Sequence, residues 1–260
     1  MRPAHPDAGP RFGDLFAAEW LKLRGQRTMF LPLLLAPPFA AGLTWPTCSR
    51  VQVIGARGRA DLDRLGASFN HGIWGVLMIG AGTVGALFLV GEFTSGLIRT
   101  TFVAVPDRRR VLLAKAAVLT TVTSAVGVLA AAASFGTAQV VLSGEGLGMS
   151  IGSPGAARGF AAAALLLPAS ALVGLAVGAL LRGPVAALGT VFAVSVLLPE
   201  FVPADGNPVL AELRGVLPRI AWTTLVDADA GSSARAWSAF ALWPVAALLA
   251  AAVVLGRRDV

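Results

Sequence analysis

The chain carries little charge and almost none of the residues that build disulfides or cysteine metal sites. Of its 260 residues, 13% are charged and 56% are hydrophobic, and the mean hydropathy is +0.75. A soluble domain usually carries about 25% charged residues. The single cysteine, Cys48, excludes an internal disulfide and a cysteine metal cluster, so we expect it to fill a small apolar space.

Lysine and histidine are also scarce, and their positions exclude two kinds of enzyme site. The ATP-binding loop G-x-x-x-x-G-K-[ST] needs a lysine, and neither Lys22 nor Lys115 follows the required glycines. Residues 148–152 fit the G-x-S-x-G pattern of hydrolases, but both histidines, His5 and His71, precede that serine. Hydrolases with this motif place their catalytic histidine after it. We therefore predict a chain that is not an enzyme and binds no cofactor, with an outer loop at 148–152.

The chain has instead several apolar runs long enough to cross a membrane. A spanning helix needs about 20 apolar residues, and residues 159–181 contain no charge at all. A helix satisfies its own backbone in lipid, and no alternation typical of a membrane β-barrel is present. We predict an all-α integral membrane protein with one six-span domain over residues 28–256. The spans are expected near residues 28–45, 70–90, 111–142, 159–181, 183–202 and 237–256.

Three of these spans have unusual features. The first is short and is interrupted by Pro32, Pro37 and Pro38. The third, at 111–142, is longer than a bilayer requires, so it is expected to tilt or to project beyond the membrane. In the fourth, Pro168 predicts a kink and a freed backbone carbonyl that a neighbouring segment must satisfy.

Basic residues next to the spans indicate how the chain crosses the membrane. Positive charge near span ends favours the cytoplasmic side, so we place residues 1–27 and 257–260 in the cytoplasm. The net charge of +7 is explained by contact with lipid headgroups, and no aromatic-rich basic groove suggests nucleic acid. The clusters that set this orientation are Lys22, Arg24 and Arg27, then Arg108 to Arg110, then Arg257 and Arg258.

A glycine-rich stretch in the second span fits a nucleotide-binding fingerprint but has a simpler explanation. Gly80, Gly82 and Gly85 match G-x-G-x-x-G, which binds dinucleotides only between a strand and a helix. Here the motif lies inside an apolar span. Small residues in a membrane helix let another helix approach closely. We therefore predict that Gly75, Gly80, Gly82 and Gly85 are helix-packing positions.

Two pairs of acidic residues raise the possibility of a membrane transferase. The pairs Asp61/Asp63 and Asp227/Asp229 could hold Mg²⁺ for a diphosphate substrate. Both pairs fall on the outer side, and neither has the longer acid-rich spacing of membrane prenyl or phosphatidyl transferases. We interpret them as solvated loop charge and expect no metal site.

The segment before the first span, residues 12–27, has an apolar helical face. Phe12, Leu15, Phe16, Trp20 and Leu23 follow helical spacing, which predicts an amphipathic helix in the membrane interface. Glu19 does not fit this simple interpretation, because an acidic side chain there falls within the apolar face. Its carboxylate needs a partner, which we expect to be Arg or Lys on another segment or on another protein.

Residues 91–101 form a polar island between the second and third spans. Glu92 and Arg99 are seven residues apart and would share one face of a helix, while Phe93 and Leu97 form an apolar pair. One interpretation is that these charges only set topology. The other is a short helix along the membrane that offers Glu92 and its Thr/Arg face to a cytoplasmic partner.

The residues after this island predict its end and the start of the third span. Pro106 is expected to end the short helix, because proline cannot continue it. Asp107 is well placed to cap the following helix.

Four segments, in this order, resemble the permease subunits of the type 2 family of ATP-binding-cassette exporters. The resemblance extends over nearly the whole chain, and one departure is Leu97, where the family often has threonine. The matching segments are Glu19-Trp20-Leu-Lys22-Leu23-Arg24, similar to E-W-x-K-L-R; Glu92-Phe-x-x-Gly96-x-x-Arg99-Thr100-Thr101, similar to E-[YF]-x-x-G-T-x-R-T-T; Pro106, Arg108 to Arg110 and Lys115, similar to P-x-x-R-x-x-x-x-x-K; and Leu217-Pro218-x-x-Ala221-Trp222.

The resemblance implies a division of labour in a bacterial cytoplasmic membrane. A separate ATPase subunit would bind ATP and dimerise, and its motion would reach the membrane through a coupling helix between spans 2 and 3. Two permeases, identical or related, would form the path at their interface, with spans 2 and 5 as candidates. The implied coupling residues are Glu92, Phe93, Gly96, Arg99, Thr100 and Thr101, and the implied interface helix contains Glu19, Trp20, Lys22, Leu23 and Arg24.

The predicted spans also bear on the kind of cargo. No span has an ionisable residue at its centre, whereas ion paths and proton-coupled carriers place such groups at mid-membrane. This argues against a secondary carrier and favours a bulky, amphipathic or lipid-like cargo, although an apolar lining is also what packing alone requires. The alternatives to an exporter are a non-transporting scaffold or sensor, a secondary carrier and a membrane-embedded transferase.

Overall fold

The computed structural model of the chain describes residues 11–50, 63–105, 107–202, 207–227 and 233–257. It is 89% helical, and no strand occurs in these ranges. Six of the helices are long and apolar enough to cross a membrane. The structure thus confirms the predicted all-α fold with six candidate spans.

The six candidate spans extend the predicted segments at most of their ends. They are α2 (Arg27–Ser49), α5 (His71–Ser95), α7 (Arg108–Gly144), α8 (Ala156–Leu181), a continuous segment made of α9 (Pro184–Phe192), the π-helix η2 (Ala193–Leu197) and α10 (Leu198–Phe201), and α13 (Ser233–Arg257). Five shorter helices complete the described chain: α1 (Phe12–Gly25), α4 (Arg64–Ser68), α6 (Leu97–Ala104), α11 (Pro208–Val216) and α12 (Pro218–Val226).

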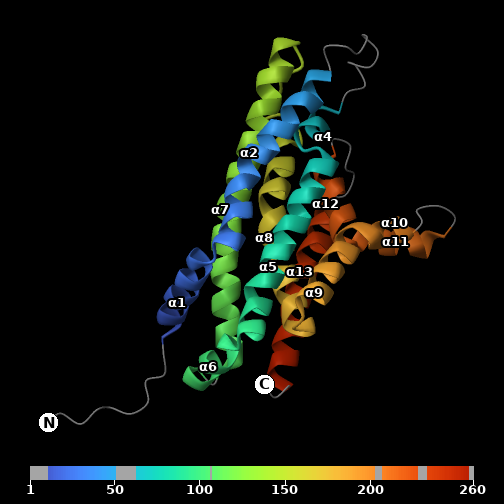
Figure 1. The fold of residues 1–260 in the computed structure, drawn as a ribbon. Coiled ribbons are helices and arrows are strands. Elements are labelled where there is room, and N and C mark those ends of the chain that lie inside the picture. The colour runs from blue at the N-terminus through green and yellow to red at the C-terminus, as the bar shows by residue number, and fades with distance from the viewer. Residues whose placement is uncertain (1–10, 51–62, 106, 203–206, 228–232, 258–260) are drawn as a thin grey trace.

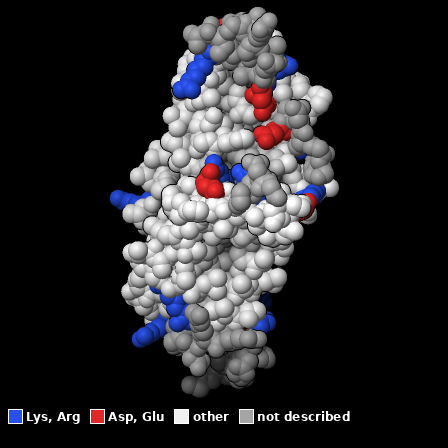
Figure 2. All heavy atoms as spheres, turned by 90° about the vertical axis from the view of Figure 1, so that its right-hand side faces the viewer, with Lys and Arg blue, Asp and Glu red and all other residues white. Residues whose placement is uncertain are grey.

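The bundle is arranged around α8, which packs against α5, α7 and α13, while α2 lies along α7 (Figure 1). α1, α6 and the last turn of α13 lie toward one end of the molecule, which we call the α6 end. α4 and the far end of α7 lie at the opposite, α4 end, and α10 and α11 project sideways. Figure 2 shows a broad uncharged band on one face, above an α6 end where basic but no acidic side chains are visible.

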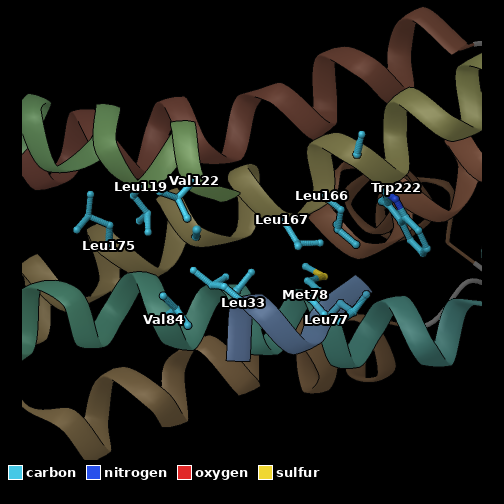
Figure 3. Close-up of a cluster of buried hydrophobic side chains, with 14 of the residues drawn as sticks. Leu33, Leu77, Met78, Val84, Leu119, Val122, Leu166, Leu167, Leu175 and Trp222 are labelled. Carbon is cyan, nitrogen blue, oxygen red and sulfur yellow. The ribbon is translucent and has the colours of Figure 1, made fainter. Parts of the chain in front are cut away.

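The core of the bundle is one large cluster of buried, mainly aliphatic side chains, and Figure 3 shows part of it between α2, α5, α7, α8 and α12. Burial of such surface contributes roughly 25 cal/mol per Å² when the surface leaves water. In a membrane the same surface leaves lipid instead, which is equally apolar, so this hydrophobic contribution is absent. Close packing therefore has to hold the helices together. Labelled members of this core cluster are Leu33, Leu77, Met78, Val84, Leu119, Val122, Leu166, Leu167, Leu175 and Trp222.

Glycine permits the closest of these contacts, between α5 and α8. A Cβ on Gly85 would overlap the backbone of Ala171, and one on Gly174 would overlap the backbone of Gly82. Gly75 and Gly80 differ, because a Cβ on either would meet no atom within 4 Å. Two of the four predicted packing glycines thus meet α8, and the other two have open space beside them.

Proline shapes the spans less than the sequence suggested. α2 runs unbroken from Arg27 to Ser49 with four internal prolines, so the expected interruption of the first span is wrong. In α8, Pro168 removes the donor for the carbonyl of Ala164. Gly127 of α7 packs directly on that carbonyl, where any side chain would overlap it. The freed carbonyl therefore lies against the backbone of α7, while the kink and the hydrogen bonding of this group stay predictions.

The third span is as long as expected. α7 has 37 residues, which is about 55 Å at 1.5 Å per residue, against about 30 Å of hydrocarbon. Its far part continues beside α2, where the hydroxyls of Thr44 and Ser134 are 2.9 Å apart and buried. Cys48 packs in the same region as a buried free thiol among small apolar side chains, as predicted for a filler.

The segment between the fifth and sixth spans contains two short helices that were not predicted from the sequence. α11 and α12 occupy it, and α12 packs against α8 and α13. Trp222 of α12 is only 1% exposed and stacks on Trp74 of α5, with ring centroids 6.1 Å apart. Leu217, Ala221 and Leu225 are spaced four residues apart, a pattern that predicts a buried helical face.

Candidate functional site: a buried charge cluster

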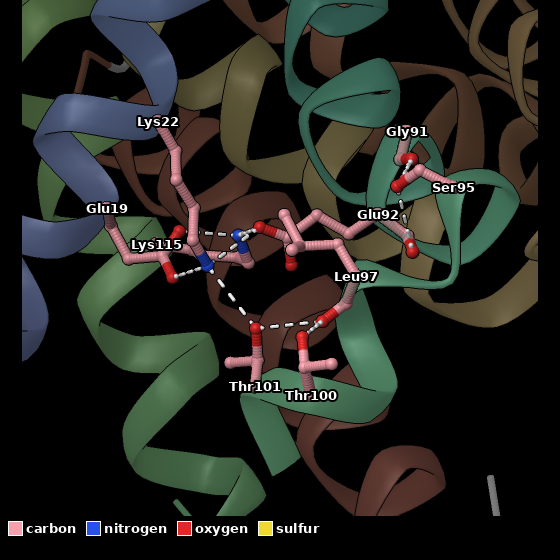
Figure 4. Close-up of polar contacts among 9 residues, drawn as sticks. All are labelled: Glu19, Lys22, Gly91, Glu92, Ser95, Leu97, Thr100, Thr101 and Lys115. Carbon is pink, nitrogen blue, oxygen red and sulfur yellow. Dashed lines mark hydrogen bonds and ion pairs between the residues drawn. The ribbon is translucent and has the colours of Figure 1, made fainter. Parts of the chain in front are cut away.

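Four charged side chains meet at the α6 end of the bundle, and we call them the charge cluster (Figure 4). Glu19 and Lys22 come from α1, Glu92 from the last turns of α5, and Lys115 from the first part of α7. The two lysines are all the lysines in the chain. Segments up to 96 residues apart in sequence are joined here.

The charges alternate in sign around the cluster. The Lys115 ammonium donates to Glu19 Oε2 at 2.5 Å and to Glu92 Oε1 at 2.7 Å. The Lys22 ammonium donates to Glu19 Oε1 at 2.7 Å and lies 2.9 Å from Glu92 Oε1. Each cation therefore contacts both carboxylates, and the four formal charges cancel.

Burial makes these pairings necessary. Lys115 is 0% exposed, Glu92 1% and Glu19 3%, and only Lys22 reaches the surface. A charge removed from water costs several kcal/mol unless partners replace its hydration. Lys115 has a further partner, because its ammonium lies 4.5 Å from the centroid of the Phe88 ring.

Burial and hydrogen bonding have opposite effects on the pKa of Lys22. Burial lowers the pKa of its ammonium, but hydrogen bonds to Glu19 and Glu92 act in the opposite direction and together prevail. The pKa of Lys22 is therefore raised above its usual value of 10.5. The side chain stays protonated at physiological pH and closes the cluster on its exposed side.

The packing of α1 on α7 explains why Glu19 reaches Lys115. Leu15 and Leu23 are buried one turn on either side of Glu19, and Leu15 packs with Val111 of α7. The predicted need of Glu19 for a basic partner is thus met by two lysines. Trp20 lies off this packed face, where it is 38% exposed and stacks on Phe16, and Phe12 is exposed as well. The contact of these side chains with the membrane interface stays a prediction.

The structure corrects the predicted helix from Glu92 to Thr101. α5 continues to Ser95, and Gly96 then adopts φ 73°, in the left-handed region that glycine occupies at little cost. α6 begins only at Leu97, so Glu92 and Arg99 lie on different helices and share no face. Glu92 is buried against Lys115 and is not offered to a partner at the surface, contrary to our expectation.

α6 itself presents two different sides. Ile98 is buried and Phe102 is half-buried, and both pack on the bundle core. Thr101 connects α6 to the charge cluster, because its hydroxyl accepts from Lys22 Nζ at 3.4 Å. The outward side exposes apolar and polar groups together, including Val103 at 85% exposure. Its members are Leu97, Arg99, Thr100 and Val103.

The start of α7 is fixed by capping, as predicted. Asp107 Oδ1 accepts from the backbone N–H groups of Arg109 and Arg110 at 3.1 and 3.2 Å. Arg108 donates to the carbonyl of Leu255 in the last turn of α13 at 3.2 Å, a favourable place for a cation. Pro106, predicted to end the short helix, lies outside the described residues, and α6 ends at Ala104.

Phe93, another predicted coupling residue, connects α5 to the end of α8. The Arg182 guanidinium lies 5.2 Å from the centroid of its ring. Arg182 itself has φ 55° as the C-cap of α8, the one positive φ at a non-glycine residue in the described chain. The turn between α8 and α9 is thus held against the same end of α5 that carries Glu92.

A second polar group at the α4 end holds α12 in place. His71 Nε2 lies 3.1 Å from Asp227 Oδ1, and Arg158 donates to the carbonyls of Leu225 and Asp227 at 3.0 and 2.6 Å. Burial raises the pKa of Asp227, an effect that the nearby His71 partly opposes. Asp63, from the other acidic pair, caps α4 through the N–H groups of Leu65 and Gly66.

These contacts explain the described members of both acidic pairs without a metal. Asp61 and Asp229 lie outside the described residues. Within the described ranges, no three His, Cys, Asp or Glu side chains gather to hold a metal ion. The G-x-S-x-G segment at 148–152 is irregular rather than a strand-to-helix turn, as expected for a loop.

Two comparisons with known proteins identify no related protein. A scan against protein-family models finds no match, and a search of curated proteins finds no similar sequence.

Proposed function

We propose that this chain is the membrane permease subunit of an ATP-driven exporter of the type 2 ATP-binding-cassette kind. The observation that carries the proposal is the composition of the charge cluster. Three of the four sequence motifs contribute to it: Glu19 and Lys22 from the first, Glu92 from the second and Lys115 from the third. Motifs that are far apart in the sequence thus meet in one charge cluster. The cluster lies next to α6, the helix that the resemblance implies to receive force from the ATPase.

The arrangement suits the transfer of motion from a partner to the spans. The outward side of α6 is free to contact a cytoplasmic ATPase, and its apolar Leu97 and Val103 would be covered on docking. Gly96 is the single residue between α5 and α6, and Lys22 connects Thr101 to α1 through a hydrogen bond. A push on α6 would then move α1, α5 and α7 together, because separating buried ion pairs is costly.

The orientation follows from the same proposal. ATP is cytoplasmic, so the α6 end would face the cytoplasm, with both chain ends on that side and the ATP bound by the partner subunit. The basic side chains without acidic ones seen there in Figure 2 support this orientation. The protein would lie in a bacterial cytoplasmic membrane.

Room for a second permease supports the expected pair. A groove of about 190 Å³ lies between α2 and α5, and Gly80 with its open surroundings lines it. Phe39 and Val76 border the groove and are exposed. A helix of an identical or related permease could approach α5 there, as small residues allow in membranes.

Co-purification tests the proposal directly. The tagged chain is extracted from native membranes in several mild detergents, and the bound proteins are identified by mass spectrometry. We expect a cassette ATPase, at a level that falls when Val103→Asp places a charge on the outward side of α6. Val140→Asp, on an exposed position of α7 away from α6, serves as the control. Absence of any ATPase in every detergent would overturn the proposal, and an ATPase without cargo movement would favour a scaffold or sensor.

A further inference from the structure

α11 belongs to an arm that leaves the bundle and buries none of its residues within the described chain. α10 and α11 project sideways in Figure 1, and all nine residues of α11 are exposed or half-buried. Isolated helices shorter than about 12–15 residues are marginal in water, so contact with other groups has to stabilise α11. α11 touches α12 and α13, but these contacts bury none of its side chains.

The surface of α11 is divided into an apolar and a polar face. Val209 and Leu213 lie one turn apart on the apolar face and are 64% and 57% exposed. Phe201, at the end of α10, is 77% exposed. An amphipathic helix of this kind places its apolar face at the boundary between lipid headgroups and acyl chains. The other positions of α11 carry small or charged side chains, namely Ala211, Glu212, Arg214 and Gly215.

The length of the fifth span places α11 at the surface of the membrane. This span begins just after Arg182, whose guanidinium lies over the Phe93 ring at the α6 end, and it runs for 18 residues to Phe201. Eighteen helical residues rise about 27 Å, close to the roughly 30 Å of a hydrocarbon core. The chain therefore leaves the hydrocarbon where the arm begins.

Charged side chains occur at the same level. Glu200 of α10 pairs with Arg219 of α12 at 3.2 Å, and Arg235 of α13 donates to both carboxylate oxygens of Glu212. Figure 2 looks at the side from which the arm projects, and acidic and basic side chains gather there at the edge of the uncharged band that lies away from the α6 end. Charges are costly inside hydrocarbon, so these pairs indicate the headgroup layer.

A tryptophan next to α11 agrees with this depth. Trp243 of α13 is half-buried, and its indole N–H donates to the carbonyl of Val216, the last residue of α11, at 2.7 Å. Tryptophan is enriched where the hydrocarbon meets the headgroups, because its ring is apolar and its N–H is polar. The span length, the ion pairs and this tryptophan therefore indicate the same level.

We propose that α11 lies along the membrane surface opposite the α6 end, bound to phospholipid. Val209 and Leu213 contact the upper part of the acyl chains, and the ion pairs of the arm lie among the headgroups. The far part of α7, which is about 55 Å long, then extends beyond this surface together with α4. This inference rests on the membrane location of the chain and does not depend on the exporter proposal.

Depth-dependent fluorescence quenching tests the position of α11. Single cysteines are introduced as Val209→Cys, Leu213→Cys or Ala211→Cys in a Cys48→Ala chain, labelled with a fluorophore and reconstituted in phosphatidylcholine vesicles. The quenchers are aqueous iodide and lipids that carry a nitroxide either near the headgroup or at the middle of an acyl chain. Labels at 209 and 213 should respond several-fold more to the nitroxide near the headgroup than to iodide. The label at Ala211, on the polar face of the same helix, should show the reverse.

Two exposed positions calibrate the depth. Leu249→Cys in α13 should respond most to the mid-chain nitroxide, and Val140→Cys in the far part of α7 to iodide. If Cys48→Ala is not monodisperse, the unmodified chain serves as the parent, because the buried Cys48 thiol is shielded from the label.

Three results would overturn the proposal. Iodide quenching of all three α11 labels would place the arm in water. Quenching by neither iodide nor nitroxide would show that protein covers it, as in an association of two copies. A response at 209 and 213 equal to that of Leu249 would place α11 deep in the hydrocarbon.

Discussion

At the scale of single residues, the charge cluster is the feature with the largest energetic consequence. Lys115 contacts two buried carboxylates from a fully buried position, whereas Lys22 contacts the same pair from a partly exposed position. Screening by solvent weakens exposed ion pairs to about 0–1 kcal/mol, but removal of one partner of a buried pair typically costs about 3–5 kcal/mol. The two lysines should therefore differ sharply in importance.

Substitution of each lysine by methionine tests this difference. Lys115→Met leaves Glu19 and Glu92 buried with only Lys22 between them, so we expect about 3–5 kcal/mol of lost stability. Lys22→Met should cost much less, because its site is partly exposed. Thermal unfolding of the detergent-solubilised variants measures both. Equal losses would show that Lys115 is not the central cation.

The sequence could predict only part of this cluster. Glu19 on an apolar helical face indicated that a basic partner was needed, because a carboxylate does not remain alone among buried side chains. Lys115 could not be identified as that partner, since it is 96 residues away and the contact depends on how α1 packs on α7. The burial of Glu92 was missed for the same reason, as its position at the end of a span suggested exposure.

At the scale of helices, span positions followed from composition, while helix ends depended on local backbone chemistry. The apolar runs predicted all six candidate spans, because length and hydropathy decide membrane crossing. The break at Gly96 was missed, since helical spacing from Glu92 to Arg99 says nothing about a left-handed residue between them. α12 was missed because nine residues are too few to register as a span.

Matched glycine substitutions separate packing within the chain from open surface. In Gly85→Ala the new Cβ would overlap the backbone of Ala171, so α5 and α8 must separate, at a cost of about 1–3 kcal/mol. Gly80→Ala meets no atom within 4 Å and should leave the stability of the single chain unchanged. Thermal stability of the monodisperse variants distinguishes the two. A destabilised Gly80→Ala with an unaffected Gly85→Ala would invalidate this account of α5.

At the scale of the whole molecule, α6 is the point where an external partner could act on several of the bundled helices at once. Thr101 contacts Lys22, the charge cluster joins α1, α5 and α7, and Arg108 joins α7 to the last turn of α13. Any displacement of α6 is therefore resisted by buried contacts on several helices at once. Coupling of this kind needs elements that move as a unit, and the cluster supplies the connection.

Arg99 gives the cleanest test of coupling, because it lies on the exposed side of α6 and outside the cluster. A Glu92→Ala variant could not separate lost coupling from lost stability, since it removes a buried partner of Lys115. In a complex reconstituted with the proposed ATPase partner, Arg99→Ala should leave membrane insertion and thermal stability intact. Cargo-dependent ATPase stimulation and export should fall roughly tenfold, which corresponds to about 1.4 kcal/mol of lost interaction.

The matched control is Arg64→Ala, which removes an exposed arginine from α4 at the opposite end of the bundle. Since α4 makes no contact with α6, export should remain at the level of the unmodified chain. Normal export in Arg99→Ala would mean that its charge serves only to orient the chain in the membrane. Equal losses in both variants would point to a general effect of surface charge, and α6 would then have no special part in receiving force from the partner.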